Sequence, residues 1–242
     1  MAAPRKVVPY PRRRAMRGFL RFLTRIAFPV LANLDVEGRE NIPEGGPLLV
    51  VGNHFSFVDP AAMIFATTWP LEFLGGVERP NAPWITQFIP YLWGYVEVPR
   101  GTGGLQGLRQ AEAVLKQNGV MGIFPEAGSW AKVLRPARPG TAYLAVRTNA
   151  RVLPLGLIGM EYLFPTLRKG KRPTVKVRVG EVFGPFDTSG RGKERREQLD
   201  EIGHRIMRKI ADLIPPEKRG YYSDDPAIRE AAKGTEIYPW DV

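Results

Sequence analysis

The run LLVVG at residues 48–52 is apolar at every position. A strand with one face in solvent alternates apolar and polar residues, whereas a strand covered by helices on both faces is apolar throughout. Similar short runs recur along the chain, and we expect strands at 34–37, 48–52, 71–74, 95–98, 120–124, 152–158 and 174–179. Segments with helical periodicity lie between them, at 60–67, near 83–88, and at 104–117, 140–148 and 193–213. This alternation predicts an α/β fold, with a single domain built on a largely parallel central sheet flanked by helices.

The length of 242 residues suits one large domain with appendages. We expect a basic amphipathic helical arm at 1–34, the main α/β domain at 35–214 and a C-terminal tail at 215–242. The tail begins at a Pro-Pro pair, after which the composition becomes polar and irregular. We therefore expect it to lie on the surface of the domain or to be partly mobile.

The net charge of +11 is concentrated in the arm. Residues 1–34 hold eight Lys and Arg side chains and no Asp or Glu, which leaves about +3 for the remaining 208 residues. A basic segment of this kind predicts an anionic partner, such as nucleic acid, a lipid surface or a phosphorylated substrate.

Residues 15–31 have the periodicity of an amphipathic helix. Its apolar side consists of Met16, Phe19, Leu20, Leu23, Ile26, Ala27, Val30 and Leu31. Its other side carries Arg14, Arg17, Arg21 and Arg25. Pro29 is expected to bend or end the helix near Phe28. The apolar part is too short to span a bilayer, which takes ~20 residues, and the arginines within it argue against a cleavable signal peptide.

Our preferred interpretation places residues 12–31 in the interface of an anionic membrane, where each basic side chain contributes about 1 kcal/mol. The chain would then be peripheral or monotopic, on the cytoplasmic side of the cell membrane. The alternative is a helix that packs on its own domain and leaves its basic side in solvent. Aromatic residues do lie near the arginines, but at core-like spacing, so we expect no nucleic-acid partner.

Polar clusters follow four of the expected strands directly. LLVVG leads into NHFSFVD, YVEV into PRGTGG, VMGIF into PEAGSW, and VLPLGLI into GME. Because parallel strands end at the same edge of a sheet, the first three clusters should meet there. They would bring together a histidine, an aspartate, an arginine, a glutamate and several backbone N–H groups.

A histidine beside a carboxylate suits proton transfer, since imidazole titrates at about pH 6.5 and a carboxylate can fix its tautomer. His54 and Asp59 are the candidates. The sequence has no cysteine and no G-x-S-x-G motif, so an external hydroxyl would be the nucleophile. Arg100 suits an anionic group.

Each of these residues also has a structural interpretation. Asp59 before Pro60 is a good helix N-cap, and a lone histidine at a strand end is more often structural than catalytic. The second histidine, His204, lies off the apolar stripe of its helix and is expected to be solvated or to pack. One histidine with scattered carboxylates is poor spacing for a metal site, and none is expected. The segment RGTGGLQG lacks the glycine spacing of a dinucleotide fingerprint.

The four clusters together resemble the lysophospholipid acyltransferase superfamily. Asn53, His54, Ser56 and Asp59 match its Asn-His-x-Ser-x-x-Asp block, and Arg100-Gly101 matches its Arg-Gly turn. Phe124, Pro125 and Glu126 match the start of its Phe-Pro-Glu-Gly-Thr-Arg-Ser block. Pro154 matches the proline of its fourth, apolar block. The resemblance covers roughly residues 35–185.

The resemblance implies a reaction and roles for these residues. His54 would be the general base on the acceptor hydroxyl, and Asp59 would orient it. The substrate-binding residues would be Arg100, Gly101, Glu126, Gly128 and Ser129. The acyl donor would be acyl-CoA or acyl-carrier protein, which is a substrate, so no cofactor is implied.

The third block departs from the family at one position that concerns the substrate. Ala127-Gly128-Ser129-Trp130 stands where the family has Gly-Thr-Arg-Ser, so Ser129 replaces the arginine implicated in phosphate binding. Lys132, Arg135 or Arg138 could supply a cation from the following loop. The sequence thus predicts a membrane-associated O-acyltransferase for a lysophospholipid, with 1-acylglycerol-3-phosphate leading. The alternatives are another lipid or glycolipid alcohol as the acceptor, or a non-catalytic lipid- or nucleic-acid-binding protein.

Overall fold

A seven-stranded mixed sheet forms the centre of the computed structural model, which describes residues 9–76, 88–98, 104–235 and 237. The strands are β1 (Asn33–Glu37), β2 (Leu48–Gly52), β3 (Glu72–Gly76), β4 (Val96–Val98), β5 (Val120–Ile123), β6 (Arg151–Ile158) and β7 (Thr174–Val179). Their order is β1-β7-β6-β2-β5-β3-β4. All neighbouring pairs are parallel except β6 and β7, which are antiparallel. The α/β fold with a largely parallel sheet is therefore confirmed.

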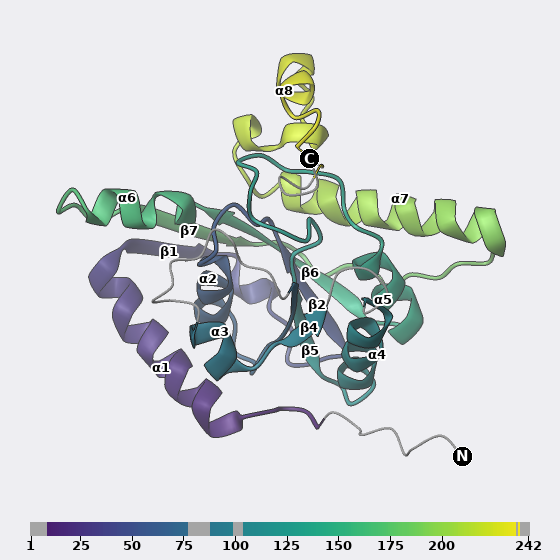
Figure 1. Ribbon diagram of the computed structural model, residues 1–242, viewed down its shortest axis with the longest axis horizontal. Coiled ribbons are helices and arrows are strands. Elements are labelled where there is room, and N and C mark those ends of the chain that lie inside the picture. The colour runs from purple at the N-terminus through teal and green to yellow at the C-terminus, as the bar shows by residue number, and fades with distance from the viewer. Residues whose placement is uncertain (1–8, 77–87, 99–103, 236, 238–242) are drawn as a thin grey trace.

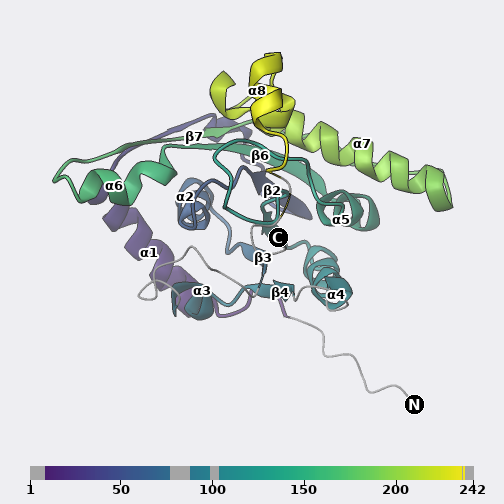
Figure 2. The ribbon, with the colours of Figure 1, turned by 45° about the horizontal axis from the view of Figure 1, so that its top comes forward.

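Helices cover both faces of this sheet (Figure 1; Figure 2). On one side are α1 (Arg14–Leu31), α2 (Asp59–Ala66) and α3 (Phe88–Trp93), and on the other are α4 (Gly104–Leu115), α5 (Gly140–Thr148) and α7 (Gly192–Ala211). Two further short helices are α6 (Leu163–Leu167), after β6, and α8 (Pro226–Ala231), near the C-terminus.

Strand β2 separates the two apolar cores that result. All five of its residues are buried. Leu48 and Val50 belong to the core under α2, while Leu49 and Val51 belong to the core under α4, α5 and α7. A strand with a core on each side has no polar face, which is the physical reason for the run LLVVG.

The strands and most helices lie where the sequence predicted them. All seven expected strands form, two of them with the expected ends and the others with ends that differ by at most two residues. The short helices α6 and α8 were not predicted. Residues 83–87 of the helix expected near 83–88 lie outside the described residues, and α3 begins at Phe88.

Helix α1 packs on the domain with Arg17 and Arg21 inward, while Arg14 and Arg25 are exposed. Arg17 is 1% exposed, and its guanidinium makes a paired contact with Glu72, which is fully buried at the start of β3. Arg12 Nη2 lies 2.6 Å from the same carboxylate. Arg21 donates to the backbone carbonyls of Thr67 and Thr68. The alternative expected a helix that packs on its own domain with a solvated basic side. The helix does pack on the domain, but only Arg14 and Arg25 are exposed, whereas Arg17 and Arg21 hold the helix to the domain.

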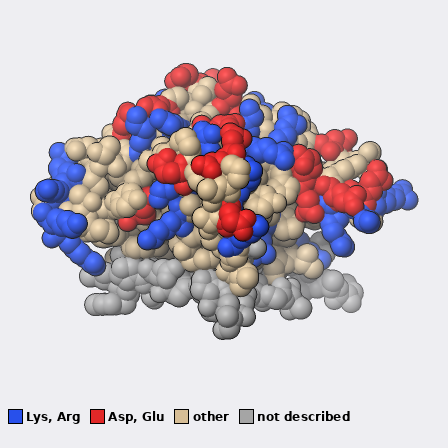
Figure 3. Space-filling view, turned by 90° about the horizontal axis from the view of Figure 1, so that it is seen from above, with Lys and Arg blue, Asp and Glu red and all other residues tan. Residues whose placement is uncertain are grey.

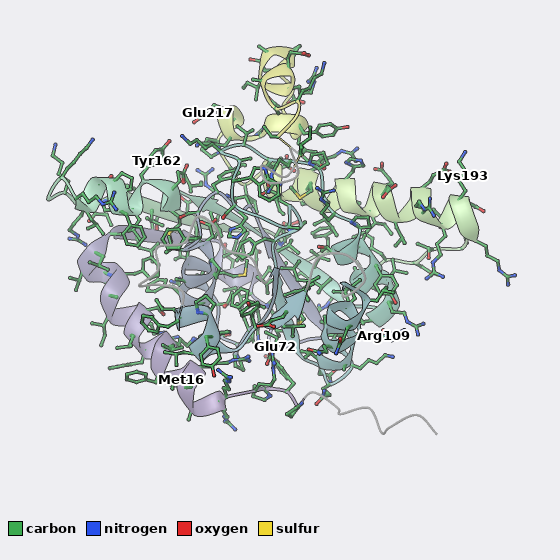
Figure 4. The ribbon with its side chains drawn as sticks, viewed as in Figure 1. Met16, Glu72, Arg109, Tyr162, Lys193 and Glu217 are labelled. Atoms are coloured by element: carbon green, nitrogen blue, oxygen red, sulfur yellow. The ribbon has the colours of Figure 1, made fainter. Side chains whose placement is uncertain are left out.

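The apolar side of α1 consequently faces outward. Its exposed members, each with between 38% and 66% of its surface accessible, are Met16, Phe19, Phe22, Leu23, Ile26, Val30 and Leu31. Figure 4 labels Met16 on the outer side of the helix and Glu72 in the interior. Of the two expected effects of Pro29, ending the helix near Phe28 does not occur: α1 continues to Leu31 with Pro29 in its last turn. No described helix is long and apolar enough to cross a bilayer.

Candidate active site

The loop after β2 is fixed to the neighbouring strand by Asn53. The Asn53 side chain is fully buried. Its amide nitrogen donates to the Leu157 carbonyl at 2.8 Å, and its amide oxygen accepts from the Leu157 N–H at 2.7 Å. Asn53 thus continues the pairing of β2 with β6 for one more residue. The loop that follows, which contains His54, therefore leaves the carboxyl edge of the sheet from a fixed point.

His54 and Asp59 lie in direct contact. His54 Nδ1 is 2.9 Å from Asp59 Oδ2, and the same oxygen accepts the Ser56 N–H at 2.7 Å. The His54 ring stacks on Phe124, with 4.1 Å between ring centroids. The ring is thus held on one face and at Nδ1, while Nε2 has no hydrogen-bond partner among the described residues. With 16% of its side chain exposed, the imidazole can meet a substrate hydroxyl.

Asp59 is not a helix N-cap. Helix α2 begins at Asp59 itself, after Val58, and no side chain caps its first turn. The hydrogen bonds of Asp59 go to His54 and to the Ser56 N–H. The interpretation of Asp59 as an N-cap in front of Pro60 is therefore wrong. Burial raises the pKa of Asp59 above its ordinary value, and Glu161 adds to this, while the hydrogen bonds with His54 and Ser56 act in the opposite direction.

Glu126 connects the loop after β5 to the histidine loop. Its side chain is fully buried; Oε1 accepts the His54 N–H at 2.8 Å and Oε2 accepts the Arg135 N–H at 3.2 Å. Burial raises the pKa of Glu126 to about 7, against the lowering influence of Arg135 and of both N–H donors, while Asp59 raises it further. A buried carboxylate with these partners positions the backbone of His54.

The substituted part of the third block has its own packing. Ala127 adopts the left-handed conformation, with φ of 58°, at the position where the family has glycine. Gly128 is required by Trp130, because a Cβ at Gly128 would lie 1.8 Å from the indole ring. Arg135 stacks on that ring at 3.6 Å and donates to the Gly128 carbonyl. The loop at Gly128 and Ser129 is therefore held by a Trp–Arg pair that the sequence did not reveal.

The three candidate cations of this loop differ in exposure. Arg135 is 1% exposed, and its Nε lies 3.5 Å from Glu126 Oε2, so it acts within the protein. Lys132 and Arg138 lie on the surface. Arg100 and Gly101 fall outside the described residues, and their roles remain predictions.

His204 was expected to be solvated or to pack, and it packs against Tyr222. His204 Nδ1 lies 3.0 Å from the Tyr222 hydroxyl. A cavity of about 460 Å³ is lined by His204, Tyr221 and other residues of α7 and the C-terminal segment, and not by His54. No group of three or more metal-ligating side chains occurs in the described part of the chain.

Comparisons with known proteins agree on one family. The model of the family "Acyltransferase" matches residues 33–158, which is about half of the chain and includes His54, Asp59 and Glu126. A 1-acyl-sn-glycerol-3-phosphate acyltransferase of Borreliella burgdorferi is 25% identical over 135 residues, which are 53% of this chain and 52% of that protein. The match thus spans about half the length of that relative.

A solved structure is similar over a larger part of the chain. The crystal structure of the 1-acyl-sn-glycerophosphate (LPA) acyltransferase PlsC from Thermotoga maritima is 26% identical in sequence and has a TM-score of 0.57, with 82% of each chain covered. The family match includes six of the seven strands and the loops that carry the His–Asp pair and Glu126. The chain belongs to the acyltransferase family.

Proposed function

We propose that this protein is a membrane-associated O-acyltransferase that moves a fatty acyl group from acyl-CoA or acyl-carrier protein to a lysophospholipid hydroxyl. The acceptor proposed is 1-acylglycerol-3-phosphate, which would give phosphatidic acid. The observation that carries the proposal is the 2.9 Å contact of His54 Nδ1 with Asp59, at the carboxyl edge of the sheet, with Nε2 left for a substrate. Both relatives described above are named as acyltransferases for this acceptor.

The mechanism follows from this arrangement. His54 Nε2 takes the proton of the acceptor hydroxyl as that oxygen bonds to the thioester carbonyl carbon. Asp59 holds the proton on Nδ1 and stabilises the imidazolium that forms. The tetrahedral intermediate then expels the thiolate as the C–S bond breaks, and the imidazolium gives its proton to the sulfur. No acyl-enzyme intermediate is required.

The acceptor's polar head is assigned to Arg100, Gly101, Glu126, Gly128 and Ser129. Glu126 is buried, so its contribution is to shape the loop, while Gly128 and Ser129 are partly exposed. Ser129 in place of the family arginine favours a second candidate, another lipid or glycolipid alcohol as the acceptor. A serine hydroxyl offers a hydrogen bond to a neutral head but no charge for a phosphate.

The membrane contact is assigned to the outer side of α1. A surface helix that exposes seven large apolar residues and binds Arg17 and Arg21 to the protein suits burial among lipid chains better than contact with water. Helix α3 contacts α1 and adds exposed Phe88, Ile89 and Tyr91.

Basic side chains near this surface support an anionic lipid. The turn between α6 and β7 carries exposed Arg168, Lys169 and Lys171, and Figure 3 shows Lys and Arg gathered at that end of the molecule. Arg172 of the same turn donates to the Pro29 and Ala32 carbonyls at the end of α1. The turn therefore lies beside the end of the apolar helix, where cations can meet anionic headgroups.

The replacement His54→Ala tests the chemistry. We expect loss of acyl transfer, measured as release of free thiol from acyl-CoA with a panel of lysolipids, with unchanged thermal unfolding and vesicle binding. His204→Gln is the matched control and should keep normal turnover. Near-normal turnover of the His54→Ala protein would contradict the assignment of the base. The preferred lysolipid of the unmodified protein decides between a phosphate-bearing and a neutral acceptor.

A further inference from the structure

The C-terminal segment binds the loop that follows β5. The Leu134 N–H donates to the Lys218 carbonyl at 2.9 Å, and the Tyr221 N–H donates to the Leu134 carbonyl at 3.1 Å. Gly220 allows this approach, because a Cβ there would lie 2.3 Å from the Leu134 carbonyl oxygen. The chain from 215 onward is thus fixed to the loop that also carries Glu126, although it lies outside the segment that matches the family.

This contact places the side chain of Lys218 between two other loops at the same edge. Lys218 Nζ lies 2.9 Å from Glu161 Oε1, with 18% of the lysine and 11% of the glutamate side chain exposed. The same ammonium group lies 5.6 Å from the ring centroids of Phe55, which follows His54, and of Tyr162. Tyr162 and Glu217, the neighbour of Lys218, lie at the same end of the molecule (Figure 4).

Glu161 follows the strand beside the one that leads into the His–Asp loop. It belongs to the polar cluster that follows β6, and β6 is the direct neighbour of β2. Its charge is one of the causes that raise the pKa of Asp59. Burial works to lower the pKa of Lys218, but the hydrogen bond and the charge of Glu161 outweigh it and raise that pKa. Lys218 is therefore charged, and it compensates a carboxylate close to Asp59.

We propose that Lys218 is a positioning residue for His54 and Asp59, and that its ion pair with Glu161 sets the charge around them. The inference deepens the proposed acyl transfer and rests on it. It adds Lys218 and Glu161, which lie outside the family match at 33–158, to His54, Asp59 and Glu126, which lie within it.

The charges at the carboxyl edge of the sheet decide in which direction the loss of Lys218 would shift the protonation of His54. Asp59 and Glu126 contact His54 directly, and Arg135, Glu161, Tyr162 and Lys218 lie on the loops around them. Arg135 compensates Glu126, and Lys218 compensates Glu161. Without the Lys218 cation, Glu161 adds a negative charge that favours the protonated imidazole. A smaller fraction of His54 is then available as a base at a given pH.

The test is a double-mutant cycle on Lys218 and Glu161, measured by the pH dependence of kcat/KM. Lys218→Met should move the acid limb of the kcat/KM profile to higher pH, because removing one positive charge leaves the negative charge of Glu161 uncompensated. Glu161→Gln should move it downward, and the double variant should return it close to its original position. Lys218→Arg, which keeps the charge, should retain the original profile.

A control variant and a second measurement distinguish failure of the ion-pair inference from failure of the proposed acyl transfer. Lys233→Met removes an exposed ion pair with Glu230 in the same C-terminal segment and should leave the profile unchanged. The His54 titration is also followed by NMR in the His204→Gln background, where it is the only histidine. If the unmodified protein has no acyl transfer, the proposed function fails while the titration still tests the ion pair. A titration that does not move in Lys218→Met, or that the double variant does not restore, overturns the inference.

Discussion

Asp59 shows at the scale of a single residue how a motif position can carry two interpretations. Its carboxylate is fully buried, and one oxygen holds both the His54 ring and the Ser56 N–H. The other oxygen, Oδ1, is buried without a hydrogen-bond partner among the described residues. A buried carboxylate oxygen without a partner lowers stability, so Asp59 is kept at this position at a cost, which agrees with an orienting role.

The replacement Asp59→Asn should separate orientation from folding. The amide keeps an oxygen for one donor but cannot stabilise an imidazolium, so we expect kcat to fall by about three to four orders of magnitude. Since Asp59 does not cap α2, the midpoint of urea unfolding should change little. Asp225→Asn is the matched control, because Asp225 is an exposed N-cap of α8 that accepts from the Ala227 N–H. Unchanged turnover of the Asp59→Asn protein would contradict the orienting role.

Glu126 should make the stability of the protein depend on pH. Its pKa is raised to about 7 in the folded state from an ordinary 4.5. The folded protein therefore binds the proton more tightly, and this stabilisation is complete below pH ~4.5 and is lost as the pH rises through ~7. The difference amounts to about 3 kcal/mol at most, and Asp59, with a pKa raised in the same direction, acts alike.

Urea unfolding at pH 5 and pH 8 measures this effect. We expect the unmodified protein to lose more unfolding free energy between these two values than the Glu126→Gln variant does. The exposed Glu217→Gln replacement is the control and should keep the full difference. Equal pH dependence in the unmodified protein and in Glu126→Gln would show that the carboxyl titrates normally.

At the scale of the element, α1 owes its orientation to one buried charge cluster. Arg17 and Arg12 share the carboxylate of Glu72, which has no exposed surface. Both the Trp93 and the Gly94 carbonyl accept further hydrogen bonds from Arg17. With Arg17 bound in this way, Phe28 and Leu20 pack on the domain, while most of the large apolar residues of the helix face outward.

Replacing Arg17 by Met should destabilise the protein strongly. Among the described residues, Glu72 would keep Arg12 alone, and removing one partner of a buried ion pair costs about 3 to 5 kcal/mol. The free energy of unfolding from urea titration measures this loss. Arg25→Met removes an exposed arginine of the same helix and should change stability by less than about 0.5 kcal/mol. A loss in Arg17→Met no larger than in this control would contradict the anchoring role.

At the scale of the whole molecule, chain direction brings the site together. Strands β2, β5 and β6 are parallel neighbours, so the loops that carry His54, Glu126 and Glu161 all leave one edge of the sheet. Distant segments likewise form the outer surface at α1. Helices α1 and α3 supply its apolar residues, and the basic turn before β7 lies beside the end of α1.

Binding to vesicles tests this assembled surface. Replacing Phe22 and Ile26 of α1 by Ser removes two exposed apolar side chains, each worth roughly 1.5 to 3 kcal/mol when fully buried. We expect at least a tenfold loss of binding in sedimentation with anionic vesicles, and weaker binding of the unmodified protein to zwitterionic vesicles. Leu105→Ser, on α4 and 65% exposed, is the control. Binding of the double variant equal to that of the control would exclude α1 as the contact.

Most of the fold and the central pair of the site were predictable from the sequence, because both depend on local pattern. Runs that are apolar throughout identify strands buried on two faces, and the spacing of Asn53, His54 and Asp59 identifies the loop. The division into arm, domain and tail remains a prediction, as do the roles of Arg100 and Gly101.

The sequence by itself determined the alternation of strands and helices and the positions of the polar loops, since burial and periodicity are written along the chain. Only the tertiary structure decided which side of α1 faces the protein, because helical periodicity is the same whichever side is buried. It also decided that Asp59 holds His54 rather than capping α2, and that Lys218 lies beside Glu161. These contacts join residues that are distant in sequence or that have two possible partners, and their choice is made by the free energy of packing the whole domain.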